Sequence, residues 1–192
     1  MNTDFSGLIK KSIKESSESI SKIDAKVVEK IAQKIVECYR NGGKVMFCGN
    51  GGSASQAQHL AAELVCKFRL TRKAYDAMSL TTDTSIITAQ SNDYSFDTIF
   101  ERQVEAHGKK GDVLIGLSTS GNSPNVIKAI EKAKQLGVYT IAFLGNNNKC
   151  KIAGIADMAL YIKSSDTPRI QEAHITAGHI ICDIIEKEIQ DE

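Results

Sequence analysis

The most constraining feature of the sequence is a short apolar run that leads into a glycine-rich turn and then into a helical pattern. The run is Lys-Val-Met-Phe-Cys at 44–48, and the turn is Gly-Asn-Gly-Gly-Ser at 49–53. Because the run is short, apolar and bounded by glycines, it predicts a buried parallel strand. The turn has no bulky side chain, and Ser53 occupies the position expected of a helix N-cap. Such a turn directs free backbone N–H groups at one point, which favours binding of an anion, most often phosphate.

Strand and helix patterns alternate along the rest of the chain. Further strands are predicted at 74–80, 112–117, 138–144 and 158–162, and helices at 8–23, 24–40, 54–68, 85–90, 96–107, 124–136 and 168–189. This alternation predicts a three-layer α/β/α fold, an open five-stranded parallel sheet of flavodoxin-like type with helices on both faces. We expect a single domain over 1–192, made of a helical N-terminal extension at 1–41 and an α/β core at 42–192.

Composition narrows the class of partner. The chain has 24 Lys and Arg against 23 Asp and Glu, a formal net charge of +1, which argues against nucleic-acid binding. No apolar run approaches the ~20 residues of a membrane span, and the first residues lack the apolar core of a signal peptide. The five cysteines are odd in number and form no Cys-x-x-Cys pair, which favours reduced thiols. We expect a cytoplasmic protein with no nucleic-acid or membrane partner.

A second small polar turn follows the strand predicted at 112–117. Its hydroxyl groups can donate to phosphate oxygens together with backbone N–H groups; they belong to Ser118, Thr119, Ser120 and Ser123. In open parallel sheets, ligands bind beyond the carboxyl ends of the strands, near the point where the strand order reverses. No lysine follows the glycine, so the turn is not a nucleotide P-loop. Small polar turns are also common where nothing binds, and that alternative stays open here.

Two helices offer candidate acid–base or metal-binding side chains. His59 and Glu63 are four residues apart after the first turn, so they share a helix face that points back toward the strand ends. On the last helix, Gln171 and His179 lie within about 80° of each other, whereas His174 is about 140° from His179. Gln171 and His179 can therefore face one site while His174 faces another. An ordinary exposed pair and structural hydrogen bonding are the alternative interpretations.

Three stretches resemble the SIS (sugar isomerase) domain family. They are the turn at 49–53 with the helix segment 59–63, the turn at 118–123, and the segment 169–179. The combination of His59, Glu63, Gln171 and His179 is similar to that of the phosphoheptose isomerases within this family. The resemblance extends over almost the whole chain, including the N-terminal helical extension and residues 92–94.

The resemblance implies an aldose–ketose isomerase. The reaction would convert sedoheptulose 7-phosphate to D-glycero-D-manno-heptose 7-phosphate through an enediol, the first step toward the heptoses of lipopolysaccharide or other surface glycans. Glu63 would be the base for the carbon-bound proton, and His179 its acid–base partner. The implied substrate-binding residues are Asn50, Gly51, Gly52, Ser53, Asp93, Ser118, Thr119, Ser120, Ser123 and Gln171.

The resemblance also implies a metal and an assembly. One zinc ion per subunit would be held by His59, Glu63, Gln171 and His179. Imidazole and carboxylate are ordinary zinc ligands, whereas an amide oxygen is unusual. A homotetramer with sites at the subunit interfaces is implied, and the amphipathic first helix agrees with this because its apolar stripe suits a partner subunit.

The chain departs from the family directly after Glu63 and Leu64. Relatives commonly continue with a small residue, glycine and arginine, where this chain has Val65, Cys66 and Lys67. Lys67 keeps the positive charge without the bidentate fork of arginine, so the sugar preference stays open. The alternatives are an isomerase of another phosphosugar, or a non-catalytic SIS protein that binds a phosphosugar or a replication-initiator partner. The complete set of catalytic-type residues favours the isomerase.

Overall fold

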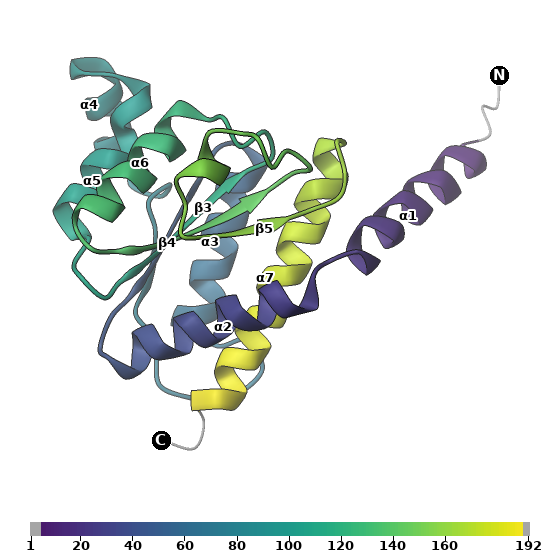
Figure 1. Cartoon of the computed structure of the whole chain (residues 1–192), viewed down its shortest axis with the longest axis horizontal. Coiled ribbons are helices and arrows are strands. Elements are labelled where there is room, and N and C mark those ends of the chain that lie inside the picture. Colours follow the sequence, from purple (N-terminus) through teal and green to yellow (C-terminus); the bar gives the residue numbers. More distant parts are fainter. Residues whose placement is uncertain (1–4, 190–192) are drawn as a thin grey trace.

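The computed structural model describes residues 5–189 and confirms the predicted three-layer fold (Figure 1). The sheet contains five strands: β1 (Val45–Gly49), β2 (Ala77–Ser79), β3 (Val113–Ser118), β4 (Tyr139–Leu144) and β5 (Met158–Tyr161). All neighbouring strands are parallel, and their order is β2-β1-β3-β4-β5. This is the flavodoxin-like order. Each of the five predicted strands is therefore present.

The strand order reverses between β1 and β3, which are direct neighbours. Their carboxyl ends are in register, with Cys48 opposite Gly116 and Gly49 opposite Leu117. The turn after β1 and the turn after β3 therefore lie side by side at the switch point of the sheet, where open α/β folds bind ligands. These are the two turns, at 49–53 and 118–123, that the sequence predicted to bind an anion.

Helices cover both faces of the sheet because successive β1 side chains point in opposite directions. Val45 and Phe47 pack under α2 (Ala25–Arg40), α3 (Gly52–Val65) and α7 (Thr167–Ile189). Met46 and Cys48 pack under α5 (Ile99–His107) and α6 (Pro124–Gln135). All five β1 residues are buried, as the uninterrupted apolar run predicted.

The predicted extension at 1–41 contains two helices with different surroundings. α2 contributes Val28, Ile31 and Ile35 to the main core. By contrast, α1 (Ser6–Ser21) projects from the body of the molecule, as Figure 1 shows. Leu8, Ile9 and Ile13 on this helix, and Phe5 at its N-cap, are exposed apolar side chains.

The start of α3 differs from the prediction. Gly51, not Ser53, is the N-cap, and Ser53 lies buried inside the first turn. The backbone of Gly51 has φ +55° and ψ −123°, a conformation that side chains disfavour, so the glycine allows the chain to enter the helix two residues earlier. The predicted N-cap role of Ser53 is wrong for this reason.

Other boundaries shift by a few residues. α3 ends at Val65 instead of continuing to 68, and α4 (Thr84–Asp93) continues as far as Asp93, into the turn predicted at 91–95. The helix predicted at 96–107 consists of a 3-10 turn, η1 (Phe96–Thr98), followed by α5. A second 3-10 turn, η2 (Ile152–Gly154), lies between β4 and β5. Over residues 5–189, no helix has the length and hydropathy needed to cross a membrane.

Candidate active site

The helices α3 and α7 pack side by side and run in the same direction. Near their beginnings Gly52 lies against the side-chain amide of Gln171, and further along Leu60 lies against Gly178. A Cβ atom on Gly178 would be 2.5 Å from Cδ2 of Leu60, so the missing side chain allows close approach of the helices. His59 directly precedes Leu60 and His179 directly follows Gly178, so this contact brings the two histidines together.

Three predicted residues converge at this level of the two helices. Nε2 of His59 lies 2.9 Å from Oε1 of Glu63 on the same helix. The same nitrogen lies 3.1 Å from Nε2 of His179 on α7. One ligand atom from each of the three residues lies within 4.8 Å of the others. We call His59, Glu63 and His179 the His–Glu–His cluster.

The atoms of the His–Glu–His cluster fit a metal ion. One imidazole nitrogen carries either a proton or a lone pair, so Nε2 of His59 cannot fully satisfy both Glu63 and His179 by hydrogen bonds. Tetrahedral zinc with bonds of about 2.0–2.1 Å places its ligands about 3.3 Å apart. The distances of 2.9 Å and 3.1 Å are close to that spacing. Two imidazoles and one carboxylate are also a donor set that zinc accepts.

The environment of His179 favours its neutral form. Burial lowers the pKa of His179, the neighbouring His59 lowers it further, and Glu63 partly opposes this effect. The ring of Phe68 stacks on the imidazole with a centroid distance of 5.4 Å and an interplanar angle of 28°. A neutral imidazole can bind a metal or accept a proton, which are the two roles predicted for this residue.

Gln171 lies apart from the cluster. Its amide group rests on Gly52, at the beginning of α3. Gln171 precedes His179 by eight residues, which corresponds to about 12 Å along a helix. Within one chain, therefore, three of the four predicted zinc ligands converge, while the amide of the fourth lies beside the glycine turn after β1.

The serine turn after β3 lines a pocket of about 380 Å³. Thr119 and Ser120 contribute to its wall, together with Thr167 and Ile170 from the beginning of α7. The pocket is completed by the loops that follow β4 and β5, so it lies at the carboxyl edge of the sheet. The hydroxyl groups and the start of α7 make this edge suitable for an anion.

The other two hydroxyls of the turn shape the loop itself. The Oγ atoms of Ser118 and Ser123 are 2.9 Å apart. Oγ of Ser118 also accepts a hydrogen bond from the backbone N–H of Gly121 at 3.1 Å. The predicted phosphate-binding hydroxyls thus divide into a pair that lines the pocket and a pair that holds the turn in shape.

Asn50 has a partner that the sequence did not reveal. Its amide nitrogen donates to Oδ1 of Asn125 at 2.9 Å, and the amide nitrogen of Asn125 donates back to Oδ1 of Asn50 at 2.8 Å. Asn125 is 1% exposed and also accepts from the N–H of Val126. The pair joins the turn after β1 to the first turn of α6. The only sequence signal was a polar residue in the first turn of that helix.

Asp93 lies away from the cluster within the chain. It ends α4, which packs beside α5 on the opposite side of the sheet from α7 (Figure 1). Its Oδ1 accepts a hydrogen bond from Asn92 at 2.8 Å. α4 has no buried residue, so much of this helix is available to another subunit.

His174 faces away from the cluster, as its helical angle predicted. It is fully buried, and its Nε2 lies 3.1 Å from the carbonyl oxygen of Leu144 at the end of β4. Burial lowers its pKa from 6.5 to about 4, although the hydrogen bond to Leu144 opposes this. His174 is thus a neutral residue that fixes α7 to the sheet.

A larger hollow, of about 620 Å³, lies at the opposite edge of the sheet. It is lined by residues that precede β3 and β4, including Lys110, Gly111 and Val138. None of the predicted site residues lines it. The chemistry-bearing residues gather instead around the carboxyl edge and the contact of α3 with α7.

Comparisons with known proteins agree with this architecture. The model of the SIS domain family matches residues 10–145. A phosphoheptose isomerase from Clostridium acetobutylicum is 53% identical, and the match covers 94% of each chain. One from Helicobacter pylori is 52% identical over 94% of this chain and 95% of the relative. The solved structure of a phosphoheptose isomerase from Neisseria gonorrhoeae has 42% identity and a TM-score of 0.86, covering 94% of this chain and 96% of that one.

Proposed function

Because this chain belongs to the SIS domain family and, within it, to the phosphoheptose isomerases, we propose that Glu63 and His179 carry its proton transfers. The chain is an isomerase enzyme. The proposed reaction converts sedoheptulose 7-phosphate to D-glycero-D-manno-heptose 7-phosphate, the first step toward heptoses of surface glycans. The observation that carries the assignment is the His–Glu–His cluster, formed by two helices that also border the polar turns.

The reaction moves two protons and needs no external oxidant. Glu63 takes the proton from the carbon beside the carbonyl, and the electrons of that C–H bond form the C=C bond of the enediol. The carbonyl oxygen gains a proton in the same step. The proton then returns to the neighbouring carbon while the other hydroxyl becomes the new carbonyl. We assign the proton movements between the oxygens to His179, whose lowered pKa favours a neutral ring that can accept and return a proton.

The phosphate group is proposed to bind at the carboxyl edge of the sheet. Thr119 and Ser120 donate from the pocket wall. The turn after β1 supplies the backbone N–H groups of Gly51 and Gly52 and the hydroxyl of Ser53, whose own N–H donates to the carbonyl oxygen of Asn50. Ser118 and Ser123 keep the serine turn in shape. Asn50, Asp93 and Gln171 are proposed to contact the sugar.

Zinc is the proposed metal, one ion per subunit. His59, Glu63 and His179 would hold it. Gln171 lies at Gly52 within one chain, so it could complete the set only from a neighbouring subunit. When bound, zinc would polarise the substrate carbonyl and favour negative charge on its oxygen. Glu63 approaches His59 through Oε1, so we assign proton transfer to its second oxygen.

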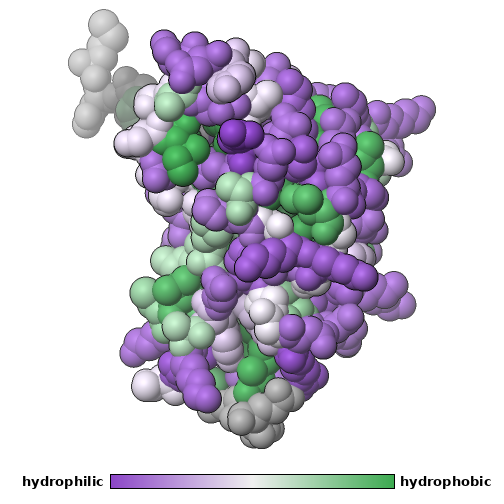
Figure 2. All heavy atoms as spheres, turned by 90° about the vertical axis from the view of Figure 1, so that its left-hand side faces the viewer, coloured by the Kyte–Doolittle hydropathy of each residue, from purple (hydrophilic) through white to green (hydrophobic). Residues whose placement is uncertain are grey.

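A homotetramer with sites between subunits is the proposed assembly. The side chain of His59 is 49% exposed, α4 has no buried residue, and α1 presents an apolar stripe. Figure 2 views the side on which α4, α5 and α6 lie and shows separate apolar patches among hydrophilic side chains. Exposed Tyr94 and Phe96 follow α4 directly. A neighbouring subunit that covers these surfaces would bring Asp93 of one chain toward the site of another.

We place the reaction in the cytoplasm. The chain has five cysteines, all of them free, and four of them are buried. A disulfide framework would be expected of a secreted domain.

The experiment for the proposed function is incubation of the purified protein with sedoheptulose 7-phosphate, followed by NMR for the aldose product. Appearance of the heptose 7-phosphate, with zinc found in the same sample, supports the reaction and the metal together. No conversion with or without added zinc would overturn the substrate assignment. Pentose and hexose phosphates belong in parallel arms, because exposed Cys66 and Lys67 depart from the glycine and arginine that the family resemblance leads us to expect there.

A further inference from the structure

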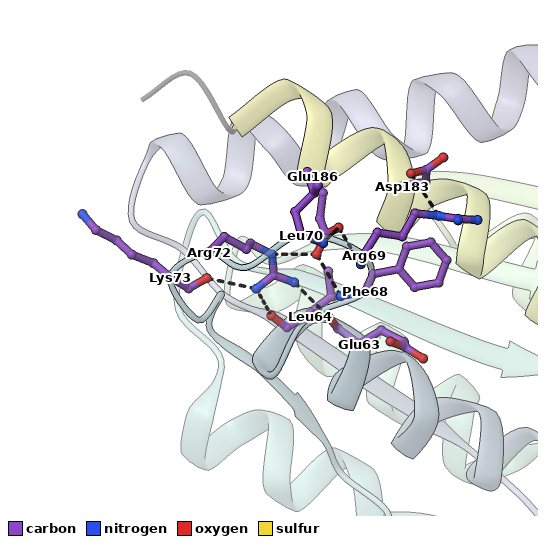
Figure 3. Close-up of polar contacts among 9 residues, drawn as sticks. All are labelled: Glu63, Leu64, Phe68, Arg69, Leu70, Arg72, Lys73, Asp183 and Glu186. Atoms are coloured by element: carbon purple, nitrogen blue, oxygen red, sulfur yellow. Dashed lines mark hydrogen bonds and ion pairs between the residues drawn. The ribbon is translucent and has the colours of Figure 1, made fainter.

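A buried carboxylate organises the segment that follows α3. Glu186 on α7 is 1% exposed and accepts four hydrogen bonds, as Figure 3 shows. The backbone N–H groups of Phe68, Arg69 and Leu70 donate to it at 2.8 Å, 2.8 Å and 3.0 Å. The fourth donor is Nε of Arg72 at 3.0 Å. Burial raises the pKa of Glu186, but the donors outweigh this effect, so the pKa lies below its ordinary value.

Arg72 extends the network to the end of α3. Its Nη2 donates to the carbonyl oxygen of Glu63 at 2.9 Å, and its Nη1 donates to that of Leu64 at 2.8 Å. The last carbonyl groups of a helix have no partner within the helix, so this planar fork satisfies two of them. The guanidinium also lies 3.9 Å from the ring centroid of Tyr75. We call Glu186, Arg72 and the backbone of residues 68–70 the Glu186 clamp.

The Glu186 clamp contacts Glu63, and it holds the backbone of the residue whose ring contacts His179. On one side Arg72 holds the backbone of Glu63. On the other side Glu186 holds the backbone of Phe68, whose ring stacks on His179. In Figure 3 the side chain of Glu63 and the ring of Phe68 extend from the clamp toward the same side. The carboxylate of Glu186 therefore fixes Glu63 through Arg72, and it fixes the imidazole of His179 through Phe68.

We propose that Glu186 is a positioning residue for the isomerisation, acting through Arg72 on Glu63 and through Phe68 on His179. The proposal rests on the proposed function for its kinetic consequence. Glu186 is seven residues after His179, about two helical turns, so it does not touch the reacting atoms itself. Its contribution is to keep the carboxylate of Glu63 and the imidazole ring at a fixed separation.

If Glu186 only stabilised the fold, its substitution would lower thermal stability without a specific loss of kcat. A second buried carboxylate in the chain, Asp112, provides a matched control. Asp112, directly before β3, is also a buried carboxylate that accepts from two backbone N–H groups and one cation. The N–H groups of Lys44 and Lys109 donate to it at 3.0 Å and 2.9 Å, and Nζ of Lys44 at 2.6 Å. Asp112→Asn removes the same charge from a similar network, whose hydrogen-bond partners belong neither to the His–Glu–His cluster nor to the Glu186 clamp.

The test compares Glu186→Gln, Arg72→Lys and Asp112→Asn in the full-length protein, by steady-state kinetics with sedoheptulose 7-phosphate. In Glu186→Gln the amide NH₂ faces backbone N–H donors, so the clamp opens without a change of size. We expect kcat to fall about 10- to 100-fold in Glu186→Gln and Arg72→Lys, with KM changed less than about threefold. Asp112→Asn should keep kcat within about twofold, whatever its loss of thermal stability. Equal kcat values in folded Glu186→Gln, Arg72→Lys and Asp112→Asn would overturn the proposal.

A second readout does not depend on turnover. Histidine ring signals from ¹⁵N-labelled protein should shift for His179 in Glu186→Gln, because the Phe68 ring moves, while those of buried His174 stay in place. Unshifted His179 signals would overturn the proposal even if kcat fell. If the wild-type protein converts no sedoheptulose 7-phosphate but His179 shifts as expected, the proposed function fails and the positioning of Phe68 stands. Arg72→Lys keeps the test decisive if Glu186→Gln does not fold.

Discussion

Nε2 of His179 lies 3.1 Å from Nε2 of His59, on the neighbouring helix. A close approach of two ring nitrogens is favourable when one of them carries a proton or when both face a cation. Because Oε1 of Glu63 lies 2.9 Å from the same His59 nitrogen, three electron-rich atoms face one point. The predictions below follow from this arrangement and from the packing that creates it.

Zinc should stabilise the protein against heat. Binding at a concentration of about 100 times Kd contributes roughly 2.7 kcal/mol to the free energy of unfolding, so Tm should rise by several degrees. The measurement is a melting curve of chelator-treated protein with and without zinc. His59→Ala should abolish the rise, whereas His107→Ala, at the end of α5, should retain it. An equal rise in both variants would place the metal elsewhere.

Glu63→Gln should remove catalysis and leave the fold intact. The amide has the shape of the carboxylate but cannot take the carbon-bound proton, so we expect kcat to fall about 10²- to 10⁴-fold. The side chain is partly exposed at 23%, and therefore Tm should change by only a few degrees. Turnover and circular dichroism on one sample separate the two effects. A variant that retains a tenth of the wild-type kcat would contradict the role of Glu63 as base.

Acid should weaken the fold through His174. The unfolded chain binds a proton at this residue below about pH 6.5, whereas the folded protein does so only below about 4. Between these values the unfolded state holds more protons, so the free energy of unfolding falls as the pH falls. From pH 7 to pH 5 this group alone should remove about 2 kcal/mol.

Urea unfolding at several pH values measures this effect. His174→Gln keeps a polar group near Leu144 but cannot titrate, so the loss between pH 7 and pH 5 should be smaller in the variant by about the same 2 kcal/mol. Glu186, with its lowered pKa, contributes stability that is lost only at still lower pH, below the ordinary pKa of a glutamate. Identical pH dependence of wild type and variant would show that His174 is not the group responsible.

Gly178→Ala should force α3 and α7 apart. The new Cβ atom would lie 2.5 Å from Cδ2 of Leu60, a side chain that is 2% exposed. Overpacking of this kind costs about 1–3 kcal/mol and should also lower kcat, because His59 and His179 flank the contact. Leu60→Val shortens the opposing side chain, so the double variant should recover part of the stability and activity. Strict additivity of the two substitutions would contradict the proposed contact.

The sequence predicted the parts of the structure that depend on local patterns. The apolar run before Gly49 and the small polar turns indicated the strands and the edge where ligands bind. The spacing of His59 and Glu63 indicated a shared helix face, and the angle between His174 and His179 separated their roles. These features depend on periodicity and turn chemistry, which a short window of sequence contains.

Features that depend on tertiary contacts were not predictable. The partner of Asn50 is Asn125, 75 residues away in sequence, and the donors to Glu186 lie 114–118 residues before it. Ser53 was misassigned as the N-cap because its side chain suits that role, while the backbone of Gly51 decided the outcome. Assignments such as Asp93 to the sugar depend on contacts beyond one chain, and they remain predictions.

The His–Glu–His cluster unites residues that are 120 positions apart in sequence, since His59 comes from α3 and His179 from α7. During synthesis on the ribosome, β1, α3 and β3 are available long before α7 leaves the exit tunnel. A nascent chain therefore carries two of the three residues of the cluster, His59 and Glu63, with nothing to complete them until translation has passed residue 179. Products that terminate before residue 179 should be unable to form the cluster, so the proposed metal site can exist only in chains translated beyond that residue.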